Sequence, residues 1–245
     1  TGKGEVFSRF PSSLKDNATT TSSTQMHFPM PGGWISGKGV YHEYGHIIHY
    51  RSWDGSTGDC GDCPGGQYMR NDNSSWSPTE REYSHAAFQE GWANFISHVI
   101  QNWPNQACES IDDNADSKVC SASEHFYPQT SSSVTSANDG KSYPRNVTKL
   151  LCDWYDDGSH NDDDPNLAGD GDHFTASLYS VYYNFDKMWD YFDGDSGLQM
   201  CDYVSYYLYG RKSIDNVGEE THEQYVSSIA DLVYNNGMKC GLSVD

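Results

Sequence analysis

Positive charge is scarce in this chain, which has 15 Lys and Arg residues against 35 Asp and Glu residues in a length of 245. The formal net charge of −20 argues against binding to nucleic acids and anionic membrane surfaces, which attract basic proteins. Long apolar runs are also missing, because no segment approaches the roughly 18 apolar residues that a membrane-spanning helix needs. We therefore expect a protein that binds neither nucleic acid nor membrane.

Apolar residues make up only 36% of the chain, but 18 Tyr, 9 Phe and 7 Trp residues are among them. Each aromatic side chain buries a large area, so we expect an aromatic-rich core. The sequence shows no internal repeat and no long linker. We therefore expect residues 1–245 to form a single domain, and the protein to be a monomer.

Seven cysteines are many for a cytosolic chain of this length and indicate an oxidising, extracellular setting. Their number is odd, so at least one thiol is free or pairs outside the chain. Cys60 and Cys63 form a C-x-x-C pair in a Gly-rich loop. This pattern favours a disulfide that ties down the loop over structural zinc or redox chemistry. Cys108 and Cys120 are plausible disulfide partners across a short polar segment. The sequence leaves open how the others pair, namely Cys152, Cys201 and Cys240.

The chain opens on Thr1-Gly2-Lys3-Gly4 rather than on Met. We therefore expect a secreted product from which a signal or pro-region has been removed.

Helical periodicity is the main pattern along the chain. Strand signals are few and early, at residues 25–30 and 34–36, so the predicted class is α+β, mainly α. The predicted helices cover residues around 40–48, 82–101, 147–155, 174–192 and 219–235.

The segment His42-Glu43-Tyr44-Gly45-His46 has the pattern H-E-x-x-H within the first predicted helix. Residues i and i+4 share a helical face, so both imidazoles can bind one zinc ion at roughly 2.0–2.1 Å. Glu43 lies beside them, where its carboxylate can take a proton from a water molecule that zinc activates. The pattern predicts a zinc site with an open, catalytic position.

Glu90, on the second predicted helix, is the candidate for the third zinc ligand. Asn94, one turn later, can accept a hydrogen bond from a zinc-binding imidazole and so fix its tautomer. His49 shares the face of His42 but lies about 10 Å further along the helix axis. We interpret it as a polar packing residue, or as a group that contacts a zinc ligand without binding zinc itself. Weaker candidates for the third ligand are Glu82, His85 and Asp54.

Together, H-E-Y-G-H and the later E-G-W-A-N-F resemble the gluzincin class of zinc metallopeptidases, in particular secreted microbial members. A weaker third element is the helix around residues 177–183, and the resemblance covers roughly residues 25–195. It implies a zincin-like catalytic domain, with a small N-terminal sheet and a helical C-terminal lobe around a zinc cleft. It also implies peptide-bond hydrolysis, with zinc held by His42, His46 and Glu90, and with Glu43 as general base.

Two features depart from the pattern. Many gluzincins have Asp where this chain has Asn94. The spacing of 44 residues between His46 and Glu90 is longer than in thermolysin-like enzymes. The resemblance therefore identifies the class and not the thermolysin-like subfamily.

A zinc peptidase also needs a donor to the oxyanion of its tetrahedral intermediate. His173 occupies a place like that of the downstream active-site histidine of thermolysin-like enzymes, which implies this role. Asp172 or Asp170 would orient its ring. Tyr179 or Tyr183 is the alternative donor.

The segment Asp156–Asp172 contains seven aspartates. Clusters of carboxylate oxygens can bind calcium, but the spacing does not match the EF-hand pattern. A solvated acidic loop is the favoured interpretation, with Ca²⁺ as the alternative.

The expected substrate is a protein or peptide lying in extended form along an edge of the early strands. A zinc amidase acting on a non-peptide or cell-wall amide would use the same water activation, and its cleft would be a closed pocket rather than a groove. A non-catalytic zinc protein would supply a fourth protein ligand. The presence of Glu43 argues against that last alternative, because a structural site needs no base.

Overall fold

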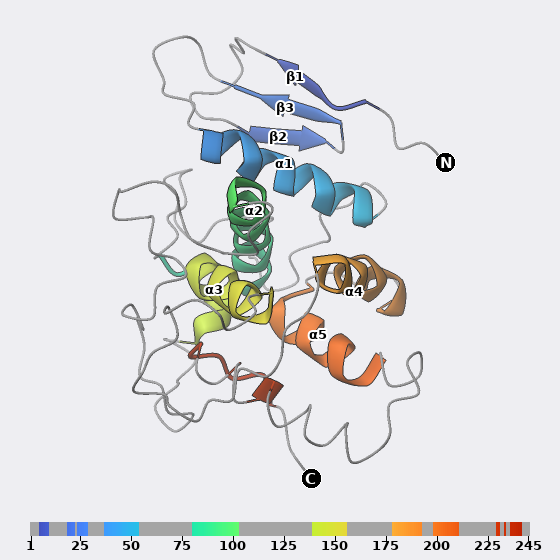
Figure 1. Cartoon of the computed structure of the whole chain (residues 1–245). Coiled ribbons are helices and arrows are strands. Elements are labelled where there is room, and N and C mark those ends of the chain that lie inside the picture. The colour runs from blue at the N-terminus through green and yellow to red at the C-terminus, as the bar shows by residue number, and fades with distance from the viewer. Residues whose placement is uncertain are drawn as a thin grey trace.

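The computed structural model is a stack of layers, with a small sheet, then helix α1, then α2, and the remaining helices beyond them (Figure 1). Helices dominate the part that the structure describes, which confirms the α+β, mainly α class. The described residues are 5–9, 19–22, 24–28, 37–53, 80–102, 139–155, 178–192, 198–210, 229–230, 233 and 236–241.

The sheet has three strands in the order β1-β3-β2. They are β1 (Phe7–Arg9), β2 (Thr19–Ser22) and β3 (Gln25–His27). β3 pairs in parallel with β1 and antiparallel with β2, so β2 is an edge strand. The strand predicted at residues 25–30 begins where expected and ends at His27, and the one predicted at 34–36 lies outside the described residues.

Helix α1 (Gly37–Ser52) lies against β2 and β3 (Figure 1). A small apolar cluster of Met26, Phe28 and Ile47 joins the sheet to this helix. Val6 and Val40 pack against the cluster and are partly buried. This contact fixes the sheet on one side of α1 and leaves another side of the helix for α2.

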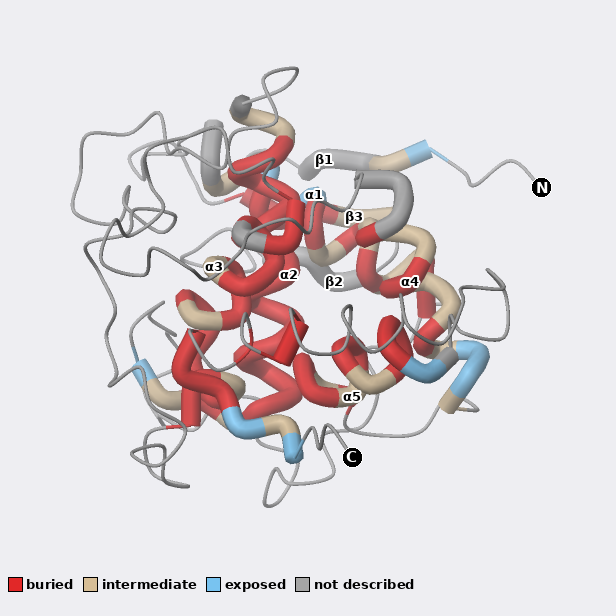
Figure 2. Tube along the Cα trace, turned by 60° about the horizontal axis from the view of Figure 1, so that its bottom comes forward, coloured by how far each residue is buried: buried red, intermediate tan, exposed pale blue. Residues whose placement is uncertain are grey.

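Helix α2 (Ser84–Asn102) is the central element, and nearly every residue along it is buried (Figure 2). Its bounds differ from the predicted 82–101 by two residues or fewer, within the usual uncertainty of helix ends. Apolar residues at helical spacing along α2 lie in the core, namely Phe88, Trp92, Phe95, Ile96 and Val99. A helix that is buried on all sides places its polar residues in the interior as well.

The contact between α1 and α2 is the most extensive between any two described elements. The two helices touch at Gly45 and Ala93. A Cβ atom added to Gly45 would lie 2.6 Å from the Ala93 Cα atom and 2.9 Å from the Ala93 carbonyl oxygen. Only glycine therefore permits this close approach of the two backbones.

Helix α3 (Pro144–Tyr155) packs against α2 and begins three residues before the predicted start. Pro144 occupies its first position, where the missing amide hydrogen costs nothing and the fixed φ angle suits a helix. The apolar face of α3 is fully buried at Val147, Leu150, Leu151 and Trp154. Helix α4 (Leu178–Tyr191) corresponds to the aromatic helix predicted at 174–192.

The core is rich in aromatic residues, as expected. The Phe185 ring of α4 stacks on Trp92 with ring centroids 3.7 Å apart and on Trp53 at 5.2 Å. The Trp53 indole nitrogen also donates to the Phe185 carbonyl oxygen at 3.2 Å. Aromatic stacking therefore ties the end of α1, the middle of α2 and α4 into one block.

One helical segment was not predicted from the sequence: α5 (Met200–Ser205), which continues as the π-helical turn η5 (Tyr206–Gly210). The backbone nitrogen of Gln199 donates to Asp202 Oδ2 at 2.9 Å and so caps its start. The sequence signal was present as apolar residues at helical spacing, namely Met200, Tyr203, Val204, Tyr207 and Leu208.

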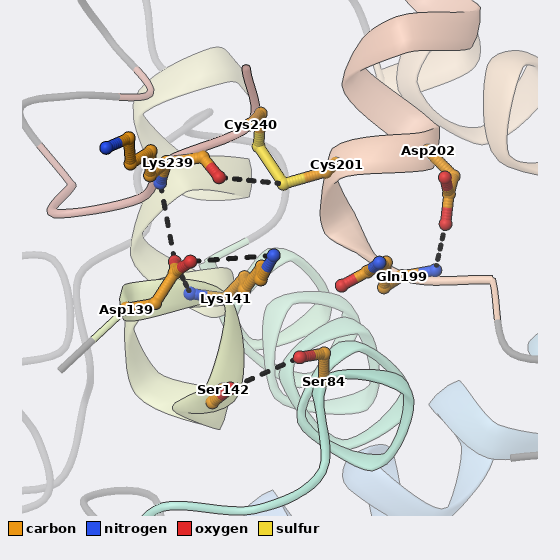
Figure 3. Close-up of a disulfide and its surroundings, with 9 residues drawn as sticks. All are labelled: Ser84, Asp139, Lys141, Ser142, Gln199, Cys201, Asp202, Lys239 and Cys240. Atoms are coloured by element: carbon orange, nitrogen blue, oxygen red, sulfur yellow. Dashed lines mark hydrogen bonds and ion pairs between the residues drawn. A yellow bond between two sulfur atoms is a disulfide. The ribbon is translucent and has the colours of Figure 1, made fainter. Parts of the chain in front are cut away.

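The C-terminal segment is fastened to the helices by a disulfide between Cys201 of α5 and Cys240 (Figure 3). This determines the pairing of two cysteines that the sequence left open. Cys152 is not part of this disulfide and lies in the core. Next to the disulfide, the Asp139 carboxylate accepts hydrogen bonds from the backbone nitrogens of Lys141 and Lys239 (Figure 3).

The short 3-10 helix η3 (Gly140–Ser142) connects this C-terminal segment to the start of α2. Its Gly140 nitrogen donates to the Gly237 carbonyl oxygen at 2.9 Å. The Glu82 backbone nitrogen donates to the Ser142 carbonyl oxygen at 2.8 Å, and the Ser84 and Ser142 hydroxyls lie 3.2 Å apart (Figure 3). The first turn of α2 is thereby held in place.

Of the last predicted helix, 219–235, only Ile229, Ala230 and Val233 lie within the described residues, and these are helical and buried. No helix in the described part combines the length and apolar character that a membrane span requires.

We predict that Gly45→Ala lowers the free energy of unfolding by about 1–3 kcal/mol, because the added methyl group forces α1 and α2 apart. Urea unfolding of the metal-free protein measures this. Gly39→Ala, in the first turn of the same helix, is the matched control and is expected to leave stability unchanged or raised, since Ala favours a helix over Gly. Equal effects of the two substitutions would contradict the close crossing.

Candidate metal centre

Helix α1 presents His42 and His46 on the side that faces α2. Their spacing places them one turn apart on one face. The two Nε2 atoms lie 3.2 Å apart, and the rings meet edge to face with centroids 4.8 Å apart. The imidazoles thus converge on one point and do not diverge into solvent.

Glu90 of α2 completes the group, as predicted from the sequence. Its Oε2 atom lies 3.2 Å from His42 Nε2 and 3.4 Å from His46 Nε2. These three residues are the group of His, Cys, Asp or Glu side chains in the described part of the chain whose ligand atoms could hold one metal ion.

The three ligand atoms fit a metal ion of the size of zinc. Ligands at 2.0–2.1 Å around a tetrahedral ion are separated from one another by about 3.3–3.4 Å. The three separations here are 3.2, 3.2 and 3.4 Å, so the triangle already has the dimensions of one tetrahedral face. Two imidazole nitrogens and one carboxylate oxygen are donors that suit zinc and neighbouring transition metals.

Asn94 lies behind His42, as the sequence predicted. The His42 Nδ1 atom is 3.1 Å from the Asn94 Oδ1 atom, and an amide oxygen can only accept, so Nδ1 carries the hydrogen. In the neutral ring, Nε2 then has the free electron pair and faces the centre of the group. Asn94 therefore fixes the tautomer of His42 that can bind a metal.

Besides Glu90, Glu43 of α1 is an acidic group at this site, and it is buried at 6% exposure. Its negative charge contributes to raising the pKa of His46, which places the carboxylate within electrostatic reach of the metal ligands. Glu43 does not belong to the ligand group. A carboxylate beside a metal site that does not bind the metal is suited to accept a proton.

Burial and charge act in opposite directions on the ligand pKa values. Burial alone would raise the pKa of Glu90, but the charges and hydrogen bonds of His46 and His42 lower it to about 2. Burial lowers the pKa of His46, but interactions with Glu90 and Glu43 outweigh this and raise it above 6.5. In the metal-free protein, the interactions with the two imidazoles therefore favour the anionic form of Glu90.

The other candidates for the third ligand lie apart from the site. His85 Nδ1 donates to the Leu198 carbonyl oxygen at 2.8 Å, and His85 Nε2 lies 2.6 Å from the Gln89 amide nitrogen. Glu82 is buried but does not belong to the ligand group. Asp54 lies outside the described residues.

Several further expectations concern residues that the structure does not describe. These are the oxyanion donor His173 with Asp170 and Asp172, the Ca²⁺ loop Asp156–Asp172, and the cysteines Cys60, Cys63, Cys108 and Cys120. The alternative donors Tyr179 and Tyr183 are both on α4, and Tyr183 is half-buried.

Comparisons with known proteins do not indicate a function, so the evidence for function comes from the chemistry of the side chains. No protein-family model matches this chain, and no curated protein or solved structure matches it. The resemblance to gluzincins therefore stays a prediction from the two motifs.

We predict that Asn94→Leu weakens zinc binding about 10–100-fold, because His42 loses the acceptor that fixes its tautomer. Asn94→Asp keeps an acceptor oxygen and is the matched control, with affinity equal to or above that of the unmodified protein. Competition with a zinc chelator measures both. Equal weakening by the two substitutions would contradict the role given to the side-chain oxygen.

The pKa values predict how the stability of the metal-free protein depends on pH. The low pKa of Glu90 contributes stability above its ordinary value of 4.5, which is lost as the pH falls toward about 2. The raised pKa of His46 contributes stability that is complete below 6.5 and is lost as the pH rises through the raised value. The contribution of this pair is therefore largest between these two ordinary values.

Thermal unfolding in the presence of a chelator, from about pH 3 to about pH 8, measures this dependence. Glu90→Gln is the control, because removal of the carboxylate lowers the pKa of His46 and flattens both flanks. A profile that is the same in the two proteins would show that the pair makes no contribution.

Proposed function

We propose that this protein is a secreted, zinc-dependent peptidase of the gluzincin type, with a zincin-like catalytic domain. The observation that carries the proposal is the convergence of His42, His46 and Glu90 from two helices, with the buried carboxylate of Glu43 on the same helix as the histidines. Within the described part of the chain, no fourth His, Cys, Asp or Glu joins the group. Three protein ligands and an open position are typical of a catalytic zinc site.

The chemistry follows from the residues around the ligands. A zinc ion held here would lower the pKa of a water molecule and polarise the substrate carbonyl group. The Glu43 carboxylate accepts the proton of the attacking water and then transfers it to the leaving amine. Because Glu43 is buried, its carboxylate is only weakly solvated and its position is fixed by the helix.

The sheet supports a peptide as the substrate. β2 is an edge strand, it contacts α1, and Figure 1 shows it as the strand nearest to that helix. An extended peptide that pairs with a strand edge forms regular main-chain hydrogen bonds and places one of its own peptide bonds near the adjoining helix. His173 remains the proposed donor to the oxyanion.

A secreted location agrees with two features of the chain. The Cys201–Cys240 disulfide forms and persists in an oxidising compartment. The strongly acidic composition gives the protein a high net charge, which favours a dissolved monomer.

The test is cleavage of an unstructured protein such as casein, with the metal content of each sample measured. We expect the unmodified protein to contain about one zinc ion per chain and to cleave. Glu43→Gln should retain the metal and lose at least about 100-fold in kcat/KM, because the general base is missing. Glu80→Gln removes the same charge at an exposed position and is the matched control, with unchanged activity.

The outcomes separate the alternatives. Zinc in all samples without cleavage by the unmodified protein would favour an amidase or a non-catalytic zinc protein. Absence of bound metal would overturn the proposal.

A further inference from the structure

His49 is a buried histidine of α1 that the proposed chemistry does not use. Its side chain is only 1% exposed. Neither ring nitrogen has a hydrogen-bond partner among the residues that the structure describes. Buried polar atoms without partners are rare in proteins and destabilise the fold, so the presence of a histidine at this position requires an explanation.

The position of His49 connects it to the metal ligands. At about 100° per residue, His42, His46 and His49 lie within about 60° of one another around the helix axis. His49 therefore continues, one turn further along α1, the face that carries two of the ligands toward α2. This face meets α2 at the Gly45–Ala93 contact.

Aromatic rings cover part of the His49 ring. It meets the Trp53 ring edge to face with centroids 4.1 Å apart, and the Phe185 ring of α4 at 5.5 Å. The titratable groups close enough to interact with it are His46 on its own helix, and His85 and Glu90 on α2. Of these groups, only Glu90 is a carboxylate, which can accept a hydrogen bond from a neutral imidazole.

The two groups are complementary in hydrogen bonding. A neutral imidazole has one N–H donor and one acceptor nitrogen, whereas a carboxylate offers two oxygens. Oε2 of Glu90 faces His42 and His46. No direct hydrogen bond joins His49 to Glu90, and polar groups separated by more than hydrogen-bond distance are commonly bridged by an ordered water molecule.

We propose that His49 is a positioning residue for the metal ligand Glu90, to which it donates a hydrogen bond through one ordered water molecule. This inference rests on the metal centre proposed above. Through the water, His49 would hold the carboxylate in the orientation that directs Oε2 at the two ligand histidines. The role is the same as that of Asn94 toward His42.

A pair of substitutions of nearly equal shape tests the proposal. Met and Gln are similar in length and unbranched, but only Gln has an N–H donor and an acceptor oxygen. We expect His49→Met to weaken zinc binding about 10–100-fold, and His49→Gln to retain most of the affinity. The order of stability should be the opposite: metal-free His49→Met should unfold at a higher temperature than metal-free His49→Gln, because Met places no polar atom in the interior.

Opposite orders of zinc affinity and metal-free stability distinguish positioning from packing, since a packing role would move both quantities together. Chelator competition and thermal unfolding measure the two. His98→Met is the control, because His98 is also a buried histidine but lies on α2. It should leave zinc affinity unchanged.

Equal zinc affinity of the unmodified protein, His49→Met and His49→Gln would overturn the inference and leave the metal centre intact. Failure of the unmodified protein to bind zinc would overturn the metal centre itself. If His49→Met does not fold, a loss of affinity in His49→Gln as large as about 100-fold would also overturn the inference, because the donor is still present.

Discussion

The candidate metal centre depends on how closely α1 and α2 approach each other. Two ligands come from α1 and the third from α2, so the separation of the helices sets the size of the ligand triangle. Gly45 on one helix and Ala93 on the other bring the backbones into contact, with no room for another atom between them. A larger residue at this point would separate Glu90 from the two histidines without changing any ligand.

The same interface places charged groups in a buried position, which is normally unfavourable. Here each group is compensated by a neighbour. Glu90 is stabilised as an anion by His46 and His42, and Asn94 accepts from the other nitrogen of His42. Three side-chain atoms converge on one point instead of forming separate pairs, so the group could hold a cation.

The rest of the fold holds α2 rigidly in position. The Thr148 hydroxyl of α3 contacts the Gly91 carbonyl oxygen at 3.0 Å, next to Glu90 in the chain. A Cβ atom on Gly91 would lie 2.5 Å from the Val147 side chain, so α3 packs directly against this turn. With η3 at the start of α2 and Phe185 stacked on Trp92, the ligand is presented by a rigid element, as a metal site requires.

The sequence alone predicted that His42 and His46 lie together, because residues four apart on a helix must lie on one face. Glu90 and Asn94 were the favoured further candidates because they share an amphipathic helix whose period is readable. The sequence also determined the helical class and the aromatic core, although its reading missed the apolar spacing of α5.

The sequence left open the choice between Glu90, Glu82 and His85, and the pairing of Cys201 with Cys240, since these depend on contacts between residues far apart in the chain. Only the tertiary structure decided them, because the crossing of α1 and α2 brings Glu90 to the histidines and directs His85 to the Leu198 carbonyl oxygen.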